Sequence, residues 1–188
     1  MTSTDTLTPA QGQALVQLAR HTLETNIGGG KLPTPELDPR LQEKGASFVT
    51  LTVDGALRGC IGTAEAHSSL VEDVKKNALH AARSDPRFAP VTAKDLDTIH
   101  VEVSVLTPPR PLDCRPEERA HHVRPGADGL LLTADFQRGL LLPQVWGKIP
   151  DPIEFLSVLC QKAGLGRSAW QRSDTELYTF QVQAFHEE

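Results

Sequence analysis

The chain has 188 residues, a length that favours one domain or two closely joined subdomains with a self-sufficient core. Its 19 basic and 24 acidic residues give a formal net charge of −5, which makes nucleic acids and anionic membranes unfavourable partners. The three cysteines are too far apart in sequence for a disulfide framework or a paired metal knuckle. Met1 to Thr6 lacks the features of a signal peptide, and no apolar run is long enough to span a bilayer, so we expect a cytoplasmic protein.

A helix is the first predicted element. Thr8-Pro9-Ala10-Gln11 has the pattern of a capping box with proline at the first helical position, and apolar residues follow at helical spacing up to Leu23. The glycines from Gly28 to Gly30 predict its end. The segment from Lys31 to Lys44 contains three prolines and predicts a loop that crosses the surface.

A β-hairpin is predicted next. Ser47 to Val53 is rich in Val, Thr and Phe, Asp54-Gly55 is a strong turn signal, and Ala56 to Thr63 returns. If the turn has two residues, the facing pairs are Val53 with Ala56, Leu51 with Arg58, and Val49 with Cys60, all on one side of the ribbon. A bulge would change this register.

A second helix and a strand follow the hairpin. Ser69-Leu70-Val71-Glu72 predicts another capping box, and Ser84-Asp85-Pro86 predicts the end of that helix. Ile99 to Leu106 alternates branched apolar residues with mostly polar ones, which predicts a strand with one core face and one unusually polar face. Pro108-Pro109 predicts its end.

The remaining chain is predicted to contain a long loop, a hairpin, a helix and a strand. Asp113 to Gly129 is charged and predicts the loop, with a helical turn near Pro116 to Arg119. The later elements are expected at Gly129 to Ala134 and Gly139 to Leu142, at Asp151 to Gly164, and at Glu176 to Phe185. This order of helices and hairpins indicates an α+β fold with mainly antiparallel sheets rather than a doubly wound parallel sheet.

The segment Leu57-Arg58-Gly59-Cys60-Ile61-Gly62-Thr63 is the first candidate site. Gly59 and Gly62 lack a Cβ, so a ligand could approach the backbone around the Cys60 thiol. Arg58 lies two residues from Cys60 on a strand, and a guanidinium nearby favours thiolate over thiol. The alternative is that Cys60 is a small buried hydrophobic residue opposite Val49.

Two further candidates have both structural and functional interpretations. Glu102 interrupts a valine-rich strand, where it is either solvated or, if its face lines a cleft, an acid, a base or a partner of Arg58. Asp85 and Arg87 lie in a proline-fixed turn that ends with Phe88. This turn either contacts an anion or a partner, or caps the helix and ties the loop to the core.

The sequence identifies no general base and no cofactor site. Four histidines are candidate bases for Cys60 only if the fold brings them close to it: His67, His100, His121 and His122. Cys114 with His121-His122 resembles a metal site loosely, without the ligand spacing of one, and no metal is expected. Cys160 lies on an apolar stripe and is expected in the core. Because the common nucleotide-binding and esterase motifs are absent, no cofactor is expected either.

The chain resembles the AMMECR-domain family over nearly its whole length. The segments that carry the resemblance, besides Leu57 to Thr63, are Ser84 to Phe88, Val101 to Leu106, Asp128 to Leu130, Gly139 to Val145, and Phe155 to Gly164 with Trp170. The resemblance implies a single domain over residues 1–188, with two unequal subdomains built on antiparallel sheets, the larger containing both termini.

The resemblance does not imply an established activity, because a family label supplies no mechanism. Bacterial members are called AmmeMemoRadiSam system protein A, which implies Memo-like and radical SAM proteins as partners in a modification pathway. Two hypotheses follow. In the first, Cys60 is a thiol nucleophile or carrier and Arg58 lowers its pKa. In the second, the Arg58–Cys60 hairpin and the Asp85–Phe88 turn bind a protein or a small anion without catalysis. RNA modification is a weaker third hypothesis, because the net charge is negative.

Overall fold

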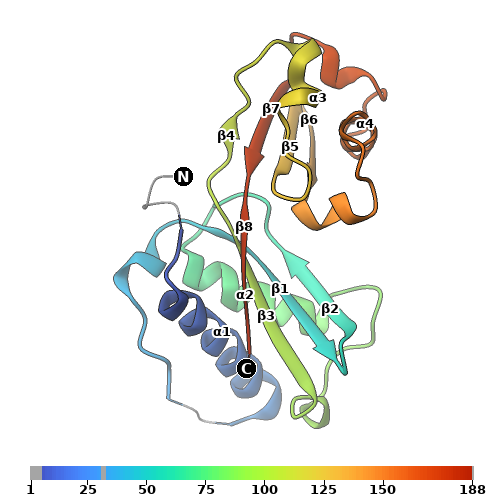
Figure 1. The fold of residues 1–188 in the computed structure, drawn as a ribbon. Helices are drawn as coiled ribbons and strands as arrows, with labels where there is room; N and C mark the ends of the chain where they lie inside the picture. Colours follow the sequence, from blue (N-terminus) through green and yellow to red (C-terminus); the bar gives the residue numbers. More distant parts are fainter. Residues whose placement is uncertain (1–5, 31–32, 188) are drawn as a thin grey trace. The chain divides into compact units, whose positions relative to one another are not determined.

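The computed structural model describes residues 6–30 and 33–187. Residues 1–5 and 31–32 lie outside the described residues, and with them lie most of the N-terminal segment and the start of the loop predicted from Lys31. The chain divides into two units, Met1–Leu106 with Gln183–Glu188, and Thr107–Val182. Each unit has a four-stranded sheet, in the orders β2-β1-β3-β8 and β4-β7-β5-β6 (Figure 1). The predicted α+β fold with antiparallel sheets is confirmed. No helix in the described ranges is long and apolar enough to cross a membrane.

The first unit contains two helices and the sheet that carries the candidate site. Its elements are α1 (Pro9–Leu23), β1 (Ala46–Val53), β2 (Ala56–Gly62), α2 (Leu70–Arg83), β3 (Ile99–Leu106) and β8 (Val182–His186). The capping box predicted for α1 is present, because the Thr8 hydroxyl accepts from the Gln11 N–H and the Gln11 side chain accepts from the Thr8 N–H. The capping box predicted for α2 is only half present among the described residues: the Ser69 hydroxyl accepts from the Glu72 N–H, whereas the Glu72 carboxylate accepts from Lys75.

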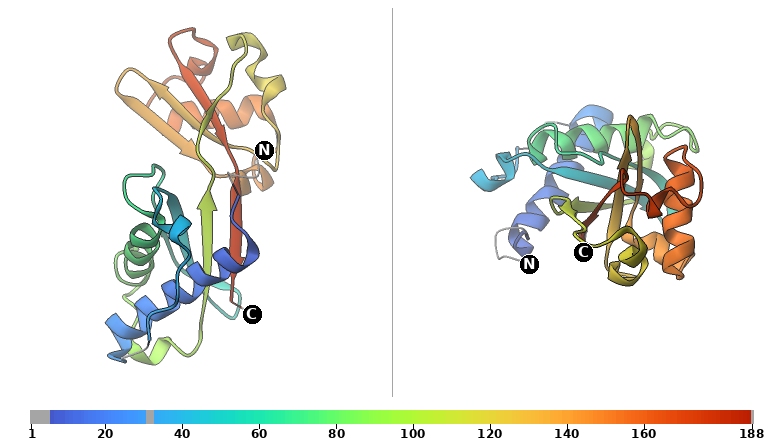
Figure 2. Two further views of the ribbon diagram at one scale, coloured as in Figure 1. Left: turned by 90° about the vertical axis from the view of Figure 1, so that its left-hand side faces the viewer. Right: turned by 90° about the horizontal axis from the view of Figure 1, so that it is seen from above.

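Both helices of the first unit cover the same face of the sheet (Figure 2). Val49 and Leu51 of β1 point to that face and are fully buried with Val103 of β3 and the apolar residues of α1 and α2. Side chains alternate along a strand, so Phe48, Thr50 and Thr52 point to the opposite face. That helix-free face of the first sheet is called the open face below.

The hairpin of β1 and β2 keeps the predicted turn but not the predicted register. Asp54 and Gly55 have φ of 50° and 76°, and Val53 pairs with Ala56. The prediction is wrong beyond that point, because a bulge inserts Arg58 and makes Thr50, not Val49, the partner of Cys60. A shift of one residue moves side chains to the other face. Gly59 therefore points to the helices, and Cys60 points to the open face.

The second unit has its own sheet and core. Its elements are β4 (Arg110–Pro111), α3 (Arg119–His122), β5 (Gly129–Ala134), β6 (Gln137–Leu141), α4 (Pro152–Lys162) and β7 (Glu176–Phe180). The core residues include Phe155 and the fully buried Cys160, which confirms the core position predicted for that cysteine. The turn between β5 and β6 is shorter than predicted, since Asp135 adopts φ 53° and β6 already begins at Gln137.

The strand predicted from Glu176 to Phe185 is two strands in different sheets, β7 and β8. The change occurs at Gln181, whose N–H donates to the Thr107 hydroxyl (2.9 Å) and whose carbonyl accepts from the Thr107 N–H (2.8 Å). Its amide nitrogen also donates to Asp128 (2.8 Å). Alternation along a strand does not report which neighbour the strand pairs with, so the sequence pattern showed one continuous element.

Candidate functional site

The Cys60 thiol lies on the open face, beside Thr50 of the neighbouring strand. The Thr50 hydroxyl donates a hydrogen bond to the sulfur at 3.3 Å. The main-chain groups of Cys60 point away from β1, since its N–H donates to Asp85 (2.9 Å) and its carbonyl accepts from Arg87 (3.4 Å). Thr50 and Cys60 are therefore a non-hydrogen-bonded cross-strand pair, the kind in which facing side chains are closest. Cys60 is half-buried.

Asp85 and Arg87 occupy the free edge of β2 at Cys60. The two side chains form a bidentate ion pair, with Nε–Oδ1 and Nη2–Oδ2 distances of 2.9 and 2.7 Å. The Asp85 side chain is 2% exposed, whereas that of Arg87 is 54% exposed. The pair takes the place that a neighbouring strand would have, and it fixes the main chain of the cysteine.

The electrostatics of this pair follow from its contacts. The hydrogen bond from Arg87 lowers the pKa of Asp85 well below its usual range against the opposing effect of burial, and the N–H groups of Cys60 and Arg87 contribute in the same direction. The pKa of Arg87 is raised, chiefly by Asp85 and to a smaller extent by the charge of Cys60. The direct contact of Arg87 with Cys60 is through the main-chain carbonyl of the cysteine.

The side chain of Arg58, predicted to lie beside the Cys60 thiol, instead contacts Ala89 and Asp95. Its Nη1 donates to the carbonyl of Ala89 at 2.7 Å, and its Nη2 lies 3.9 Å from the Asp95 carboxylate. It makes no ion pair with Glu102 among the described residues. Since Arg58 is the extra residue of the bulge, the two-residue spacing to Cys60 does not place the two side chains as a regular strand would.

Glu102 lies in the same row of the open face as the thiol. It pairs with Thr50 across β1 and β3, and Thr50 pairs with Cys60 across β1 and β2. The Ser104 hydroxyl, two residues along β3, donates to the Glu102 carboxylate at 3.3 Å. The face therefore carries a thiol, two hydroxyls and a carboxylate next to one another, and Glu102 and Ser104 are half-buried.

The two glycines near Cys60 are explained by packing. A Cβ on Gly59 would lie 2.1 Å from the carbonyl oxygen of Ala81 in α2, and one on Gly62 would lie 2.2 Å from the ring of Phe48. The prediction that these glycines leave room for a ligand is wrong, because helix backbone and an aromatic ring occupy the space. Their role is to let α2 and Phe48 approach β2 closely.

The other thiols and histidines do not join this site. Burial raises the pKa of Cys114 and of Cys160, which disfavours a thiolate at either position. His100 follows the alternation of Glu102 to the open face, where it is exposed and pairs with Thr52. His67 lies 3.4 Å from Glu65. In the ranges that the structure describes, no three His, Cys, Asp or Glu side chains gather as a metal site.

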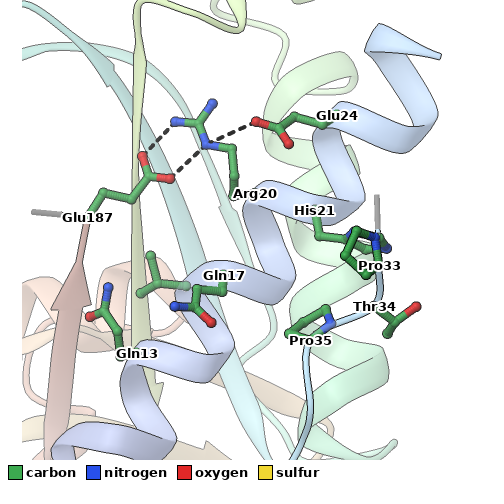
Figure 3. A pocket seen from close by; sticks show the side chains of 10 residues that line it. Gln13, Gln17, Arg20, His21, Glu24, Pro33, Thr34, Pro35 and Glu187 are labelled. Carbon is green, nitrogen blue, oxygen red and sulfur yellow. Dashed lines mark hydrogen bonds and ion pairs between the residues drawn. The ribbon is translucent and has the colours of Figure 1, made fainter. Parts of the chain in front are cut away.

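A separate pocket of about 390 Å³ lies along α1 (Figure 3). Arg20 crosses it and forms a bidentate pair with Glu187, with Nε–Oε1 and Nη2–Oε2 distances of 2.7 and 2.6 Å. Arg20 also donates to the carbonyls of Leu96 and Ile99, and Glu187 accepts from the N–H of Val101. The pair connects α1, β3 and the end of β8, which is a structural role.

Replacing Glu187 by glutamine is expected to destabilise the protein by about 2 kcal/mol, because the half-buried Arg20 loses its counter-charge. Chemical denaturation followed by circular dichroism measures this. Glu24→Gln is the matched control, because Glu24 lies 4.0 Å from the same arginine and shares no close hydrogen bond with it. Equal effects of the two substitutions would contradict the structural role of Glu187.

Comparison with known proteins identifies the family. The AMMECR1 family model matches residues 16–185. The chain belongs to the AMMECR1 family. A protein of Thermococcus gammatolerans is 46% identical to it, covering 94% of this chain and 90% of the relative, and one of Methanothermobacter thermautotrophicus is 44% identical, covering 95% of each. The crystal structure of the uncharacterized protein PH0010 from Pyrococcus horikoshii is similar, with a TM-score of 0.84, 41% identity, and coverage of 97% of this chain and 94% of that one.

For this AMMECR1 chain, the structure adds two residues that the sequence analysis missed. Thr50 and Ser104 are hydroxyl residues on strands β1 and β3, and each contacts one of the predicted site residues. Alternation alone would have placed Ser104 beside Glu102. Thr50 could not be found, because its contact with Cys60 depends on the bulge.

Proposed function

We propose that this AMMECR1 protein is a thiol-dependent group-transfer protein in which Cys60 is the nucleophile or carrier. The observation that supports this best is the hydrogen bond from the Thr50 hydroxyl to the sulfur of a half-buried cysteine on the open face. A hydroxyl that donates to sulfur stabilises the negative charge of a thiolate. The Asp85–Arg87 pair supports the same role, because it holds the Cys60 main chain at the sheet edge.

The proposed chemistry needs one covalent step at sulfur. The thiol loses its proton to solvent, and the sulfur forms a bond to an electrophilic carbon of the donor. The bond between that carbon and its leaving group breaks, and the leaving group keeps the electron pair. A carrier then releases the group when an acceptor atom displaces the sulfur.

The test is a search for a covalent adduct on Cys60. We expect intact-protein mass spectrometry to show an added mass on the protein after incubation with a metabolite extract. Cys60→Ser is expected to remove the adduct, whereas the matched variant Cys114→Ser keeps it. The proposal is wrong if the wild-type protein forms no adduct and cells with Cys60→Ala carry out the modification pathway as well as cells with the wild-type protein do.

A binding module without catalysis is the second candidate. It is favoured by Arg87, whose side chain is 54% exposed and whose Nη1 donates to no other described residue. In this alternative, a small anion or an acidic group of a partner protein binds that nitrogen. Arg87→Lys would then weaken binding of the anion, and Cys60→Ala would retain it.

The proposed partners are Memo-like and radical SAM proteins, acting with this chain in a modification pathway. Support for them is the family resemblance alone. Co-purification of the tagged protein with such proteins from its own cells is the direct test, and the same recovery with an unrelated tagged protein of similar charge would count against them.

A further inference from the structure

Glu102 is a half-buried carboxylate without a cation. Its one hydrogen bond among the described residues comes from the Ser104 hydroxyl, and no lysine, arginine or histidine nitrogen of those residues lies within ion-pair distance. Two exposed histidines, His100 and His186, share the open face and make no ion pair with Glu102. His186 lies on this face because it alternates with Phe185, which packs against the core. A carboxylate that is partly removed from water without a counter-charge is unfavourable. The Glu102 carboxylate is therefore positioned to bind a cationic group of another molecule.

Its distance from the thiol follows from the pairing. Cys60 and Thr50 are a non-hydrogen-bonded pair, so Thr50 and Glu102 on the other side of the central strand are a hydrogen-bonded pair. The Cα atoms in such pairs are about 4.5 and 5.5 Å apart, which places Cys60 and Glu102 about 10 Å apart across β1. Their side chains leave the same face, with the Thr50 hydroxyl between them.

We propose that Glu102 determines substrate specificity at Cys60 by binding a positively charged group, an ammonium or a guanidinium, of the molecule that reacts with the thiol. The inference rests on the proposed function and adds the substrate class. The cationic group binds at Glu102, two strands away from the Cys60 sulfur, so it is a different part of the substrate from the atom that reacts with the thiol. The substrate spans Thr50, with its electrophilic atom at Cys60 and its charge at Glu102.

Charged thiol reagents test this without knowledge of the natural substrate. Three methanethiosulfonates that differ in charge, carrying a trimethylammonioethyl, a sulfonatoethyl or a methyl group, react with Cys60 in a Cys114→Ser background. In each case the sulfur forms a mixed disulfide and displaces a sulfinate. The second-order rates are followed by mass spectrometry at low salt.

We expect Glu102→Gln to lower the rate of the cationic reagent relative to the neutral one by about three- to five-fold, the effect of one charge at roughly 8–10 Å near a protein surface. The rate of the anionic reagent rises relative to the neutral one. Glu102→Asp restores most of the cationic preference. Glu72→Gln is the matched control, because it removes an exposed carboxylate from α2, on the other side of the sheet, and leaves all three rates unchanged.

The outcomes separate this inference from the proposed function. If the neutral reagent does not modify Cys60 in the wild-type background, the proposed function fails and the substrate class fails with it. If the neutral reagent reacts readily and Glu102→Gln behaves as Glu72→Gln does, the thiol is accessible but Glu102 does not select a cation. That result overturns the inference alone.

Discussion

Replacing Gly59 by alanine is expected to destabilise the protein by at least about 3 kcal/mol, since overpacking against rigid backbone has few ways to relax. The new methyl carbon would lie 2.1 Å from the Ala81 carbonyl oxygen and 3.0 Å from its carbonyl carbon. These are helix backbone atoms, so no side-chain rotation can relieve the contact. Either α2 or β2 must move, and the movement also displaces the fully buried Ala78 and Val74.

Thermal and chemical denaturation of Gly59→Ala measure the effect. Gly147→Ala is the matched control, because a Cβ there meets no atom within 4 Å and the residue has no positive φ. We expect the control to change stability by less than about 0.5 kcal/mol. A Gly59→Ala protein as stable as the control would mean that α2 is not packed on β2 as described.

Local signals explain why much of the fold could be predicted. The strand from Ile99 to Leu106 was predicted with the bounds that the structure has, because both its alternation and the following prolines are local. The N-termini of α1 and α4 were also predicted correctly, since a capping side chain and an N1 proline act within one turn. These features depend on residues a few positions apart, which a sequence pattern can show.

The predictions that failed depend on partners distant in sequence. The bulge at Arg58 accommodates the approach of Ala81, which follows more than twenty residues later. The division of the last strand depends on Thr107 and Asp128, far from Gln181. In both cases a local pattern is compatible with two arrangements, and tertiary packing selects one.

The candidate site was predictable in part for the same reason. Cys60 and Glu102 are candidates because of their side-chain chemistry, which the sequence shows, and the sheet brings them into one row through Thr50. Arg58 is a candidate only through its two-residue spacing from Cys60 on a regular strand, and the bulge makes this part of the strand irregular. The arginine that contacts Cys60 is instead Arg87, through the main-chain carbonyl of the cysteine, and the sequence places Arg87 in a separate turn.

Asp85→Asn is expected to destabilise the protein by about 3 kcal/mol at pH 7, because it breaks a buried, charge-assisted pair and turns an amide NH₂ toward the donors of Arg87. The loss also releases the edge of β2, since Asp85 accepts the N–H of Cys60. We therefore expect lower protection of the Cys60 amide in hydrogen exchange, together with a lower melting temperature.

The pH dependence of this effect has a definite sign. The pKa of Asp85 is lower in the folded protein than the value near 3.9 of an unfolded chain, so the carboxylate stabilises the fold at pH values above about 4. That contribution is lost as the pH falls from about 4 toward the lower folded pKa. The difference in melting temperature between wild type and Asp85→Asn should be constant from pH 7 to 5 and narrow below pH 4.

Asp174→Asn is the matched control for this prediction. Asp174 also pairs with an arginine two residues away, Arg172, but both side chains are about half exposed. An exposed pair contributes little, so the control should lose much less stability than Asp85→Asn does. Two results would show that the charge of Asp85 does not hold the edge of β2 at Cys60. One is an equal loss of stability in both variants, and the other is a gap in melting temperature for Asp85→Asn that is as wide at pH 3 as at pH 7.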